Sequence, residues 1–124
     1  LNKVKYPYNI NSLTINETLK NLSAINNDQW ICEIIKERIL LKMALTELSF
    51  VEKIYESDTN FLLVKFRNAK KIQIYLKERG ILVRDRSQHK LTRDCLRITV
   101  GKASENKLLI ETLKELDYAT CTVF

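Results

Sequence analysis

Residues 61–66 read Phe-Leu-Leu-Val-Lys-Phe, and residues 96–100 read Leu-Arg-Ile-Thr-Val. The first stretch is a dense apolar run of strand-forming residues, and the second alternates apolar with polar side chains. Both patterns predict β-strands. In the second stretch the apolar residues share one face, so Arg97 and Thr99 are expected on the opposite face.

Amphipathic segments on both sides of these strands predict helices. The expected helices run from a cap at Asn11 or Ser12 to about residue 24, over 28–48, from a cap at Asn68 to Gly80, and from a cap at Ser104 through Leu116. Further strands are expected at 51–55 and 81–84, with a last edge strand at 118–124. The long helix over 28–48 carries a broad apolar stripe, which we expect to face the core: Trp30, Ile31, Ile34, Ile35, Leu41, Leu45 and Leu48.

This order of elements predicts an α+β fold, a small and mostly antiparallel sheet with helices packed against it. The chain has 124 residues, which is enough for one hydrophobic core. Its 2 glycines and 1 proline argue against a turn-rich β-barrel and against low-complexity sequence. The first two helices follow one another in sequence and could instead connect this unit to a segment upstream. The chain opens with Leu1 and not with Met, so we expect it to be a piece of a longer protein.

Three cysteines, Cys32, Cys95 and Cys121, are expected to be buried free thiols of a reducing cytoplasm. Their spacing does not match a zinc site, and we predict no metal ligands. The sequence also lacks an apolar run long enough to cross a membrane and a secretory signal pattern. These features predict a cytoplasmic location.

The net charge is +6, and the arginines are unevenly distributed. Four of the 7 lie within residues 84–97, namely Arg84, Arg86, Arg93 and Arg97. A guanidinium inside a strand needs either bulk water or a fixed anion, because it does not lose its charge by deprotonation. Its planar fork suits bidentate binding of a carboxylate or a phosphate. The pattern therefore indicates an anion-binding site built on Arg84 and Arg97.

Other interpretations of this basic segment remain open at the level of sequence. The arginines could be solvated, or they could pair with Asp85, with Asp94 or with a glutamate on a helix. Nucleic-acid binding is less favoured, because the two flanking strands lack aromatic residues on which bases stack. His89 is the only histidine, and without a carboxylate partner it is not expected to be catalytic. No catalytic residue is predicted in this chain.

Five segments of the chain carry a resemblance to a known family: Pro7-Tyr-Asn-Ile-Asn-Ser-Leu-Thr14, Phe50-Val-Glu-Lys-Ile-Tyr55, Ser57-Asp-Thr-Asn-Phe-Leu-Leu-Val-Lys-Phe66, Gly80-Ile-Leu-Val-Arg-Asp-Arg-Ser87 and Cys95-Leu-Arg-Ile-Thr-Val-Gly101. These segments resemble the C-terminal portion of histidinol-phosphate aminotransferases, pyridoxal-phosphate enzymes of the aspartate-aminotransferase superfamily. They occur in the order and spacing of the family, and together they run nearly from end to end of the chain.

The resemblance implies roles for the two arginines. Arg97 matches the arginine that holds the α-carboxylate of glutamate or 2-oxoglutarate and, in this subfamily, the phosphate of histidinol phosphate. Arg84 matches a second arginine that helps to hold that phosphate. Residues 1–11 would be the crossing from a large domain, and residues 12–124 would form the small C-terminal domain.

The resemblance also implies what this chain lacks. In the family the large domain supplies the Schiff-base lysine and most contacts to pyridoxal phosphate, and no lysine here matches that one by its surroundings. The chain alone is therefore expected to be inactive and to bind the cofactor only nonspecifically, whereas its parent would be a homodimeric transaminase. The alternatives are a related aminotransferase, a threonine-phosphate decarboxylase, or a freestanding anion- or nucleic-acid-binding module. A last alternative is a purely structural lid in which Arg84 and Arg97 are paired internally.

Overall fold

The computed structural model describes residues 10–22 and 27–121 of the chain. They divide into two compact units, one within residues 1–30 and one within residues 31–124. The first unit contains helix α1 (Ser12–Leu22). Helix α2 (Asn27–Thr46) begins at the end of this unit and continues into the second. The predicted crossing segment falls almost entirely outside the described residues.

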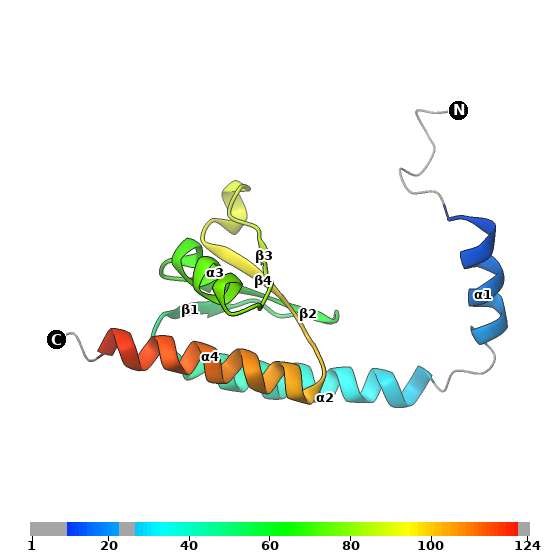
Figure 1. Ribbon diagram of the computed structural model, residues 1–124, viewed down its shortest axis with the longest axis horizontal. Helices are drawn as coiled ribbons and strands as arrows, with labels where there is room; N and C mark the ends of the chain where they lie inside the picture. Colours follow the sequence, from blue (N-terminus) through cyan, green and yellow to red (C-terminus); the bar gives the residue numbers. More distant parts are fainter. Residues whose placement is uncertain (1–9, 23–26, 122–124) are drawn as a thin grey trace. The chain divides into compact units, whose positions relative to one another are not determined.

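A four-stranded antiparallel sheet forms the centre of the second unit (Figure 1). Its strands are β1 (Val51–Ile54), β2 (Phe61–Phe66), β3 (Arg84–Asp85) and β4 (Cys95–Thr99), in the spatial order β1-β2-β4-β3. Helix α3 (Ala69–Glu78) connects β2 to β3, and helix α4 (Ala103–Cys121) follows β4. The predicted α+β fold is confirmed.

All three helices of this unit pack on the same face of the sheet. Alternate residues of the central strands are buried on that face, as in Leu62, Val64 and Phe66 of β2. They join one hydrophobic cluster with residues from α2, α3 and α4, which include Leu41, Leu45, Ile72, Leu76, Leu109 and Leu113. The sheet therefore has an inner face, which carries the core, and an outer face away from the helices.

Helices α2 and α4 lie side by side and run in the same direction (Figure 1). Near the start of α4, the amide of Asn106 donates to the Glu37 carboxylate of α2 over 2.8 Å. Near the end of α2, Glu47 pairs with Lys114 at 3.6 Å. Asn106 is buried, and its side chain also bonds the backbone N–H and C=O of Gly101. It therefore fixes the corner between β4 and α4.

The predicted helix caps at Asn11 and Asn68 are confirmed. The Asn11 carboxamide oxygen accepts from the Thr14 N–H at 2.8 Å, and that of Asn68 accepts from the Lys71 N–H at 3.0 Å. Gly80 ends the α3 segment with a φ of +77°, a left-handed conformation that residues with a Cβ rarely adopt. The cap predicted at Ser104 is wrong, because α4 begins one residue earlier, where Glu105 accepts from the Lys102 N–H.

Two predicted strands differ from the structure. The segment expected as an edge strand at 118–124 continues α4 as far as Cys121, and its last three residues lie outside the described chain. The strand expected at 81–84 is only Arg84–Asp85. The Ile81 N–H bonds back to the Leu76 carbonyl, so this residue still belongs to the end of the helix.

The apolar stripe of α2 is only partly in the core. Leu41, Leu45 and Leu48 are buried as expected, whereas Trp30, Ile31, Ile34 and Ile35 are exposed in this chain. Cys95 is buried, but Cys32 is exposed, which contradicts the expectation for that thiol. The side chain of Cys121 lies outside the described residues. None of the described helices combines the length and apolar character needed to cross a bilayer.

The packing of α2 predicts a large loss of stability from one leucine substitution and a small loss from another on the same helix. Leu45 is 0% exposed, so Leu45→Ala should lower the free energy of unfolding by about 2–5 kcal/mol through the cavity it leaves. Leu40 is 49% exposed, and Leu40→Ala should cost less than about 1 kcal/mol. Urea unfolding followed by circular dichroism measures both. Equal losses would show that α2 does not pack as described.

Candidate anion-binding site

The pairing of β3 with β4 brings the two predicted site residues together. Arg84 is the direct partner of Arg97 in the antiparallel register. Side chains of directly opposed residues project from the same face of a sheet, with Cβ atoms about 4.5–5.5 Å apart. Leu96 and Ile98 point into the core, so both arginines lie on the outer face. The structure thus places the two arginines at neighbouring positions on the same face of the sheet.

Arg97 lies in the middle of this face and is half-buried. Its other cross-strand neighbour is Leu63 of β2, and its guanidinium carbon lies 5.2 Å from the centre of the Phe61 ring. Its Nε is buried and has no hydrogen-bond partner among the described residues. A buried donor without an acceptor costs about 1–3 kcal/mol, which is unusual in a folded protein. Arg84, at the edge of the sheet, is exposed.

Neither arginine has a carboxylate partner within residues 10–22 and 27–121. Asp85 pairs with Leu96 in the register and therefore projects from the inner face. Its carboxylate accepts from the Ser87 N–H at 2.8 Å. Asp94 lies 4.0 Å from Arg93. The interpretation in which Arg84 and Arg97 are neutralised by these aspartates is therefore wrong.

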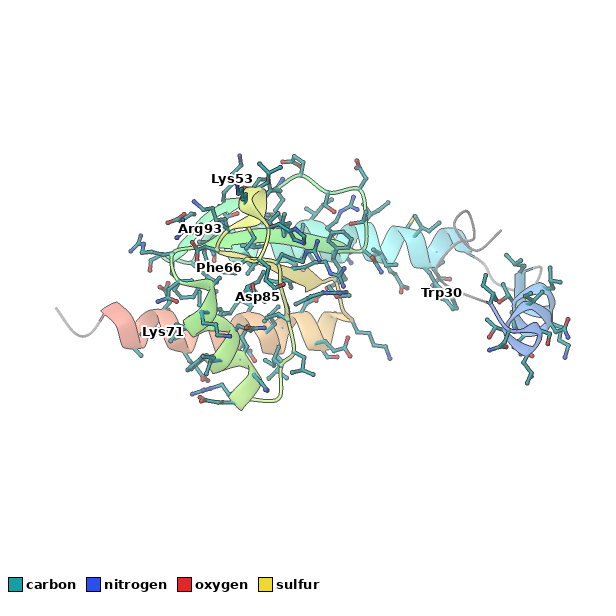
Figure 2. All side chains as sticks on the ribbon, turned by 90° about the horizontal axis from the view of Figure 1, so that it is seen from above. Trp30, Lys53, Phe66, Lys71, Asp85 and Arg93 are labelled. Atoms are coloured by element: carbon teal, nitrogen blue, oxygen red, sulfur yellow. The ribbon has the colours of Figure 1, made fainter. Side chains whose placement is uncertain are left out.

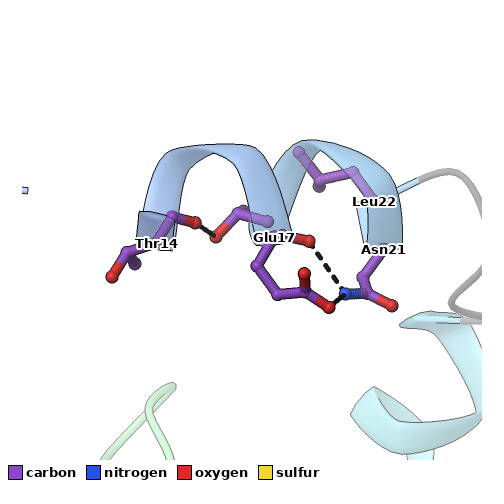
Figure 3. Close-up of a pocket in the computed structure, with 5 residues that line it drawn as sticks. Thr14, Glu17, Asn21 and Leu22 are labelled. Carbon is purple, nitrogen blue, oxygen red and sulfur yellow. Dashed lines mark hydrogen bonds between the residues drawn. The ribbon is translucent and has the colours of Figure 1, made fainter. Parts of the chain in front are cut away.

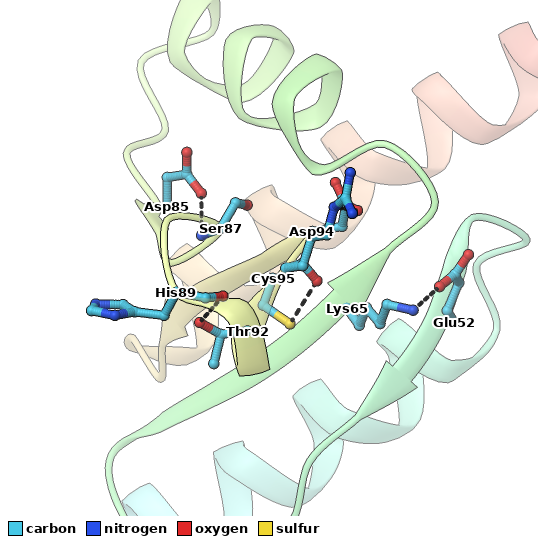
Figure 4. A network of polar contacts seen from close by, with 9 residues as sticks. Glu52, Lys65, Asp85, Ser87, His89, Thr92, Asp94 and Cys95 are labelled. Carbon is cyan, nitrogen blue, oxygen red and sulfur yellow. Dashed lines mark hydrogen bonds and ion pairs between the residues drawn. The ribbon is translucent and has the colours of Figure 1, made fainter.

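The polar loop between the two strands is held by its own hydrogen bonds, of which Figure 4 shows those between Asp85 and Ser87 and between Thr92 and His89. Arg86 donates its N–H to the Cys95 carbonyl, and the Thr92 hydroxyl donates to the Arg86 carbonyl at 2.6 Å. Asp94 ends the loop with a φ of 57°, a conformation that aspartate tolerates better than most residues, and its carbonyl accepts from the Phe66 N–H. These contacts fix the short strand that carries Arg84 against β4.

The other end of the outer face is also basic. A β-bulge at Glu52 sets Lys53 opposite Lys65, and Glu52 pairs with Lys65 at 2.8 Å, which raises the pKa of that lysine. A polar hollow lies over these residues, and its lining includes Lys90 and Arg93 from the loop. Lys53 and Arg93 lie near each other at this hollow in Figure 2. The outer face is therefore positively charged at both ends.

Aromatic residues also line the outer face, which sequence reasoning missed. Strands β3 and β4 contain none, as expected, but the neighbouring β2 places Phe61 against Arg97. Beyond β1, the Tyr55 ring lies 4.8 Å from the Lys53 ammonium. The absence of aromatics from the flanking strands therefore does not argue against nucleic-acid binding, because the sheet supplies rings from other strands. Only the strand order, which the sequence does not contain, reveals this.

Neither His89 nor the depression on α1 brings together a set of reactive side chains among the described residues. The His89 side chain is exposed, and its carbonyl accepts from the Thr92 N–H. A depression on α1 is lined by residues whose side chains bond within the helix, such as the Asn21 amide with Glu17 (Figure 3). Among the described residues, no group of three histidine, cysteine, aspartate or glutamate side chains could hold a metal.

Comparison with known proteins supplies the family. The family model "Aminotransferase class I and II" matches residues 8–113, which is most of the chain. The chain belongs to the aminotransferase class I and II family. Histidinol-phosphate aminotransferases of Christiangramia forsetii and Flavobacterium psychrophilum are 48% and 45% identical to it, each over 94% of the chain. The chain spans about a third of the length of these curated relatives.

Solved structures share the fold. The histidinol-phosphate aminotransferase from Clostridium acetobutylicum matches 94% of the chain and has a TM-score of 0.79 at 20% identity. This chain covers 36% of that protein. The L-threonine-O-3-phosphate decarboxylase from Porphyromonas gingivalis matches 86% of the chain with a TM-score of 0.67 and 26% identity, and the chain covers 34% of it. These structures confirm the predicted fold, and the family model and the sequence identities confirm the predicted resemblance.

The aminotransferase family depends on pyridoxal phosphate, but the described residues do not fit a covalent site for this cofactor. A lysine that forms a Schiff base must lose its proton, which burial favours. No lysine within the described residues is buried. Lys65, which is half-buried, has its pKa raised by Glu52 and is therefore held in the charged form. The basic outer face suits anions, not covalent capture of an aldehyde.

The Asp85–Ser87 contact predicts a dependence of stability on pH. The hydrogen bond from Ser87 lowers the pKa of the Asp85 carboxyl below its ordinary value. A lowered pKa in the folded state stabilises the fold above the unfolded pKa of about 3.9, and this contribution disappears as the pH falls through the folded value. Between pH 7 and pH 2, the free energy of unfolding should fall less for Asp85→Asn than for the unmodified chain. The control is Asp58→Asn, which replaces an exposed aspartate and should leave the dependence of stability on pH as in the unmodified chain. The same dependence for Asp85→Asn would contradict the prediction.

The exposure of the lysines predicts how this chain reacts with pyridoxal phosphate. After addition of the aldehyde and reduction with borohydride, peptide mapping should find partial labelling spread over several lysines, because none of those described is fully buried. Stoichiometric labelling of one lysine at a low concentration of pyridoxal phosphate would show a specific covalent site instead.

Proposed function

We propose that this chain is the substrate-binding small domain of an aminotransferase that exchanges an amino group between L-histidinol phosphate and 2-oxoglutarate. In this proposal Arg97 and Arg84 together bind the anionic end of each substrate. The sequence identity to histidinol-phosphate aminotransferases supports the choice of substrates. The observation that carries the proposal is the direct opposition of the two arginines on the outer face.

Two cations in this arrangement favour a multiply charged ligand. Like charges directly opposite one another in a sheet are destabilising, and here no described carboxylate relieves the repulsion. A bound phosphate or carboxylate removes that penalty and accepts charge-assisted hydrogen bonds from both guanidinium groups. The site therefore gains more from binding an anion than two separated arginines would. The same pair serves a phosphate and a carboxylate because both offer paired oxygen acceptors.

The proposal divides the work between this chain and the remainder of a longer enzyme. Residues 12–124 hold and orient the substrate anion, and residues 1–11 are the crossing from a large domain. Pyridoxal phosphate, bound by that large domain, supplies the electron sink for the transfer. The chain alone is then inactive, and the complete enzyme is a homodimer.

A chimaera tests this function directly. The C-terminal third of the Christiangramia forsetii enzyme, which is 48% identical to this chain, is replaced by residues 1–124. The chimaera should transaminate L-histidinol phosphate with 2-oxoglutarate, and Arg97→Ala should lower kcat/KM for both substrates about 30- to 700-fold, the equivalent of about 2–4 kcal/mol. The control is Arg79→Gln. Arg79 is exposed and follows the last residue of α3, so this substitution should leave both values unchanged.

Two outcomes would contradict the proposal. Equal kcat/KM for the Arg97→Ala and Arg79→Gln chimaeras would remove Arg97 from the site. Release of carbon dioxide from threonine phosphate, without transamination of histidinol phosphate, would assign the chain to the decarboxylase function of its structural relative from Porphyromonas gingivalis. Folding of each chimaera is checked by its thermal unfolding.

A further inference from the structure

We propose that Phe61 is a positioning residue for Arg97: its ring holds the guanidinium in the orientation that receives the substrate anion. This inference rests on the proposed function of Arg97. The ring centre lies 5.2 Å from the guanidinium carbon, within the range of a cation–π contact. Phe61 pairs with Thr99, two residues beyond Arg97, so its side chain lies diagonally across the strand pair from the arginine.

The surroundings of Arg97 leave few ways to orient its side chain. Leu63 lies opposite on β2 and offers no acceptor, while Arg84 lies opposite on β3 and repels it. The Nε atom is buried without a hydrogen-bond partner. A flexible arginine would move this donor into water, since an unpaired buried N–H is costly. An attractive contact must offset that cost, and the Phe61 ring is the one the described residues provide.

Burial of Nε also determines which donors remain for a ligand. The inner edge of the guanidinium is closed to solvent, so the terminal nitrogens are the donors that an incoming anion can reach. Arg84, exposed on the adjacent strand, can approach the same anion from the side. An orientation fixed before binding lowers the conformational entropy lost on binding, which is how the ring would increase affinity.

The backbone of Phe61 is itself firmly held. The Ser57 hydroxyl donates to its carbonyl at 2.6 Å, and the preceding carbonyl, of Asn60, accepts from the Val100 N–H at 2.8 Å. Arg38 of α2 donates to the Thr59 carbonyl at 2.7 Å and so ties the same turn to the helix layer. Three hydrogen bonds therefore hold the turn that carries the Phe61 ring. A ring that positions another side chain needs such a fixed backbone.

Inorganic phosphate serves as the probe, and binding to the full chain is followed by NMR. In the unmodified chain the Arg97 Nε–H should give a discrete resonance that exchanges slowly with water and shifts as phosphate binds. Phe61→Leu should broaden or lose this resonance and weaken phosphate binding about three- to tenfold. Phe61→Tyr keeps the ring and should restore both properties. Phe61→Met removes the ring in the same way if the leucine variant is unfolded.

The matched control is Tyr75→Leu, which removes another ring from beneath an arginine. The guanidinium carbon of Arg79 lies 3.5 Å from the ring centre of Tyr75, a residue of α3. This variant should leave the Arg97 resonance and the phosphate affinity unchanged. If Tyr75→Leu and Phe61→Leu change the resonance and the affinity equally, a general loss of stability explains both effects, and the inference is overturned.

A further variant separates failure of the inference from failure of the proposed function. Arg97→Gln should remove most phosphate binding. If it does, but Phe61→Leu binds phosphate as tightly as the unmodified chain, then the anion site stands and the positioning role of Phe61 is refuted. If Arg97→Gln binds phosphate normally, the site itself is wrong, and the positioning role falls with it.

Discussion

The functional account of this chain depends on the register between β3 and β4. Two hydrogen-bonded residues, Arg84 and Asp85, are the whole of β3, and this short pairing decides which side chains meet. A shift of one residue would turn Arg84 to the inner face and Asp85 to the outer face, next to Arg97. The arginine would then find an internal carboxylate, and no anion site would exist. The loop contacts that hold this register are therefore as important to the site as the arginines.

The packing of the helices makes such a site possible. Because α2, α3 and α4 all cover the inner face, the sheet buries its apolar residues there and leaves the outer face to other side chains. A charged residue such as Arg97 can then lie in a central position of the sheet without entering the core. The neighbouring strand β2 supplies Phe61 and Leu63, which surround the charge with apolar groups. A low-dielectric surround of this kind strengthens the attraction for a bound anion.

Local chemistry made much of the fold predictable from the sequence. The caps at Asn11 and Asn68 and the turn at Gly80 are decided by a few neighbouring residues, and the alternation in 96–100 correctly assigned Arg97 to the face opposite the core. The strand predicted at residues 118–124 is wrong over residues 118–121, which are helical. The alternation at 118–124 is short, and the apolar residues of α4, Leu109, Leu113 and Leu116, favour continuation of the helix to Cys121.

Features of the site that arise between strands could not be predicted. The sequence places Arg84 and Arg97 thirteen residues apart, but only the pairing shows that they are direct partners. Phe61 lies even further from Arg97 along the chain, and its contact requires both the strand order and the register. The buried stripe of α2 was overestimated, because an amphipathic pattern does not indicate how much of a helix the core can cover.

The central claim is that Arg84 and Arg97 hold one anion between them, and a double-mutant cycle on phosphate affinity tests it most directly. The measurement compares the unmodified chain with Arg84→Gln, Arg97→Gln and the double variant. If both guanidinium groups bind the same phosphate, the loss in the double variant should be clearly smaller than the product of the two single losses, because either substitution alone already breaks the site. Losses that multiply would show two independent charges and would contradict the account.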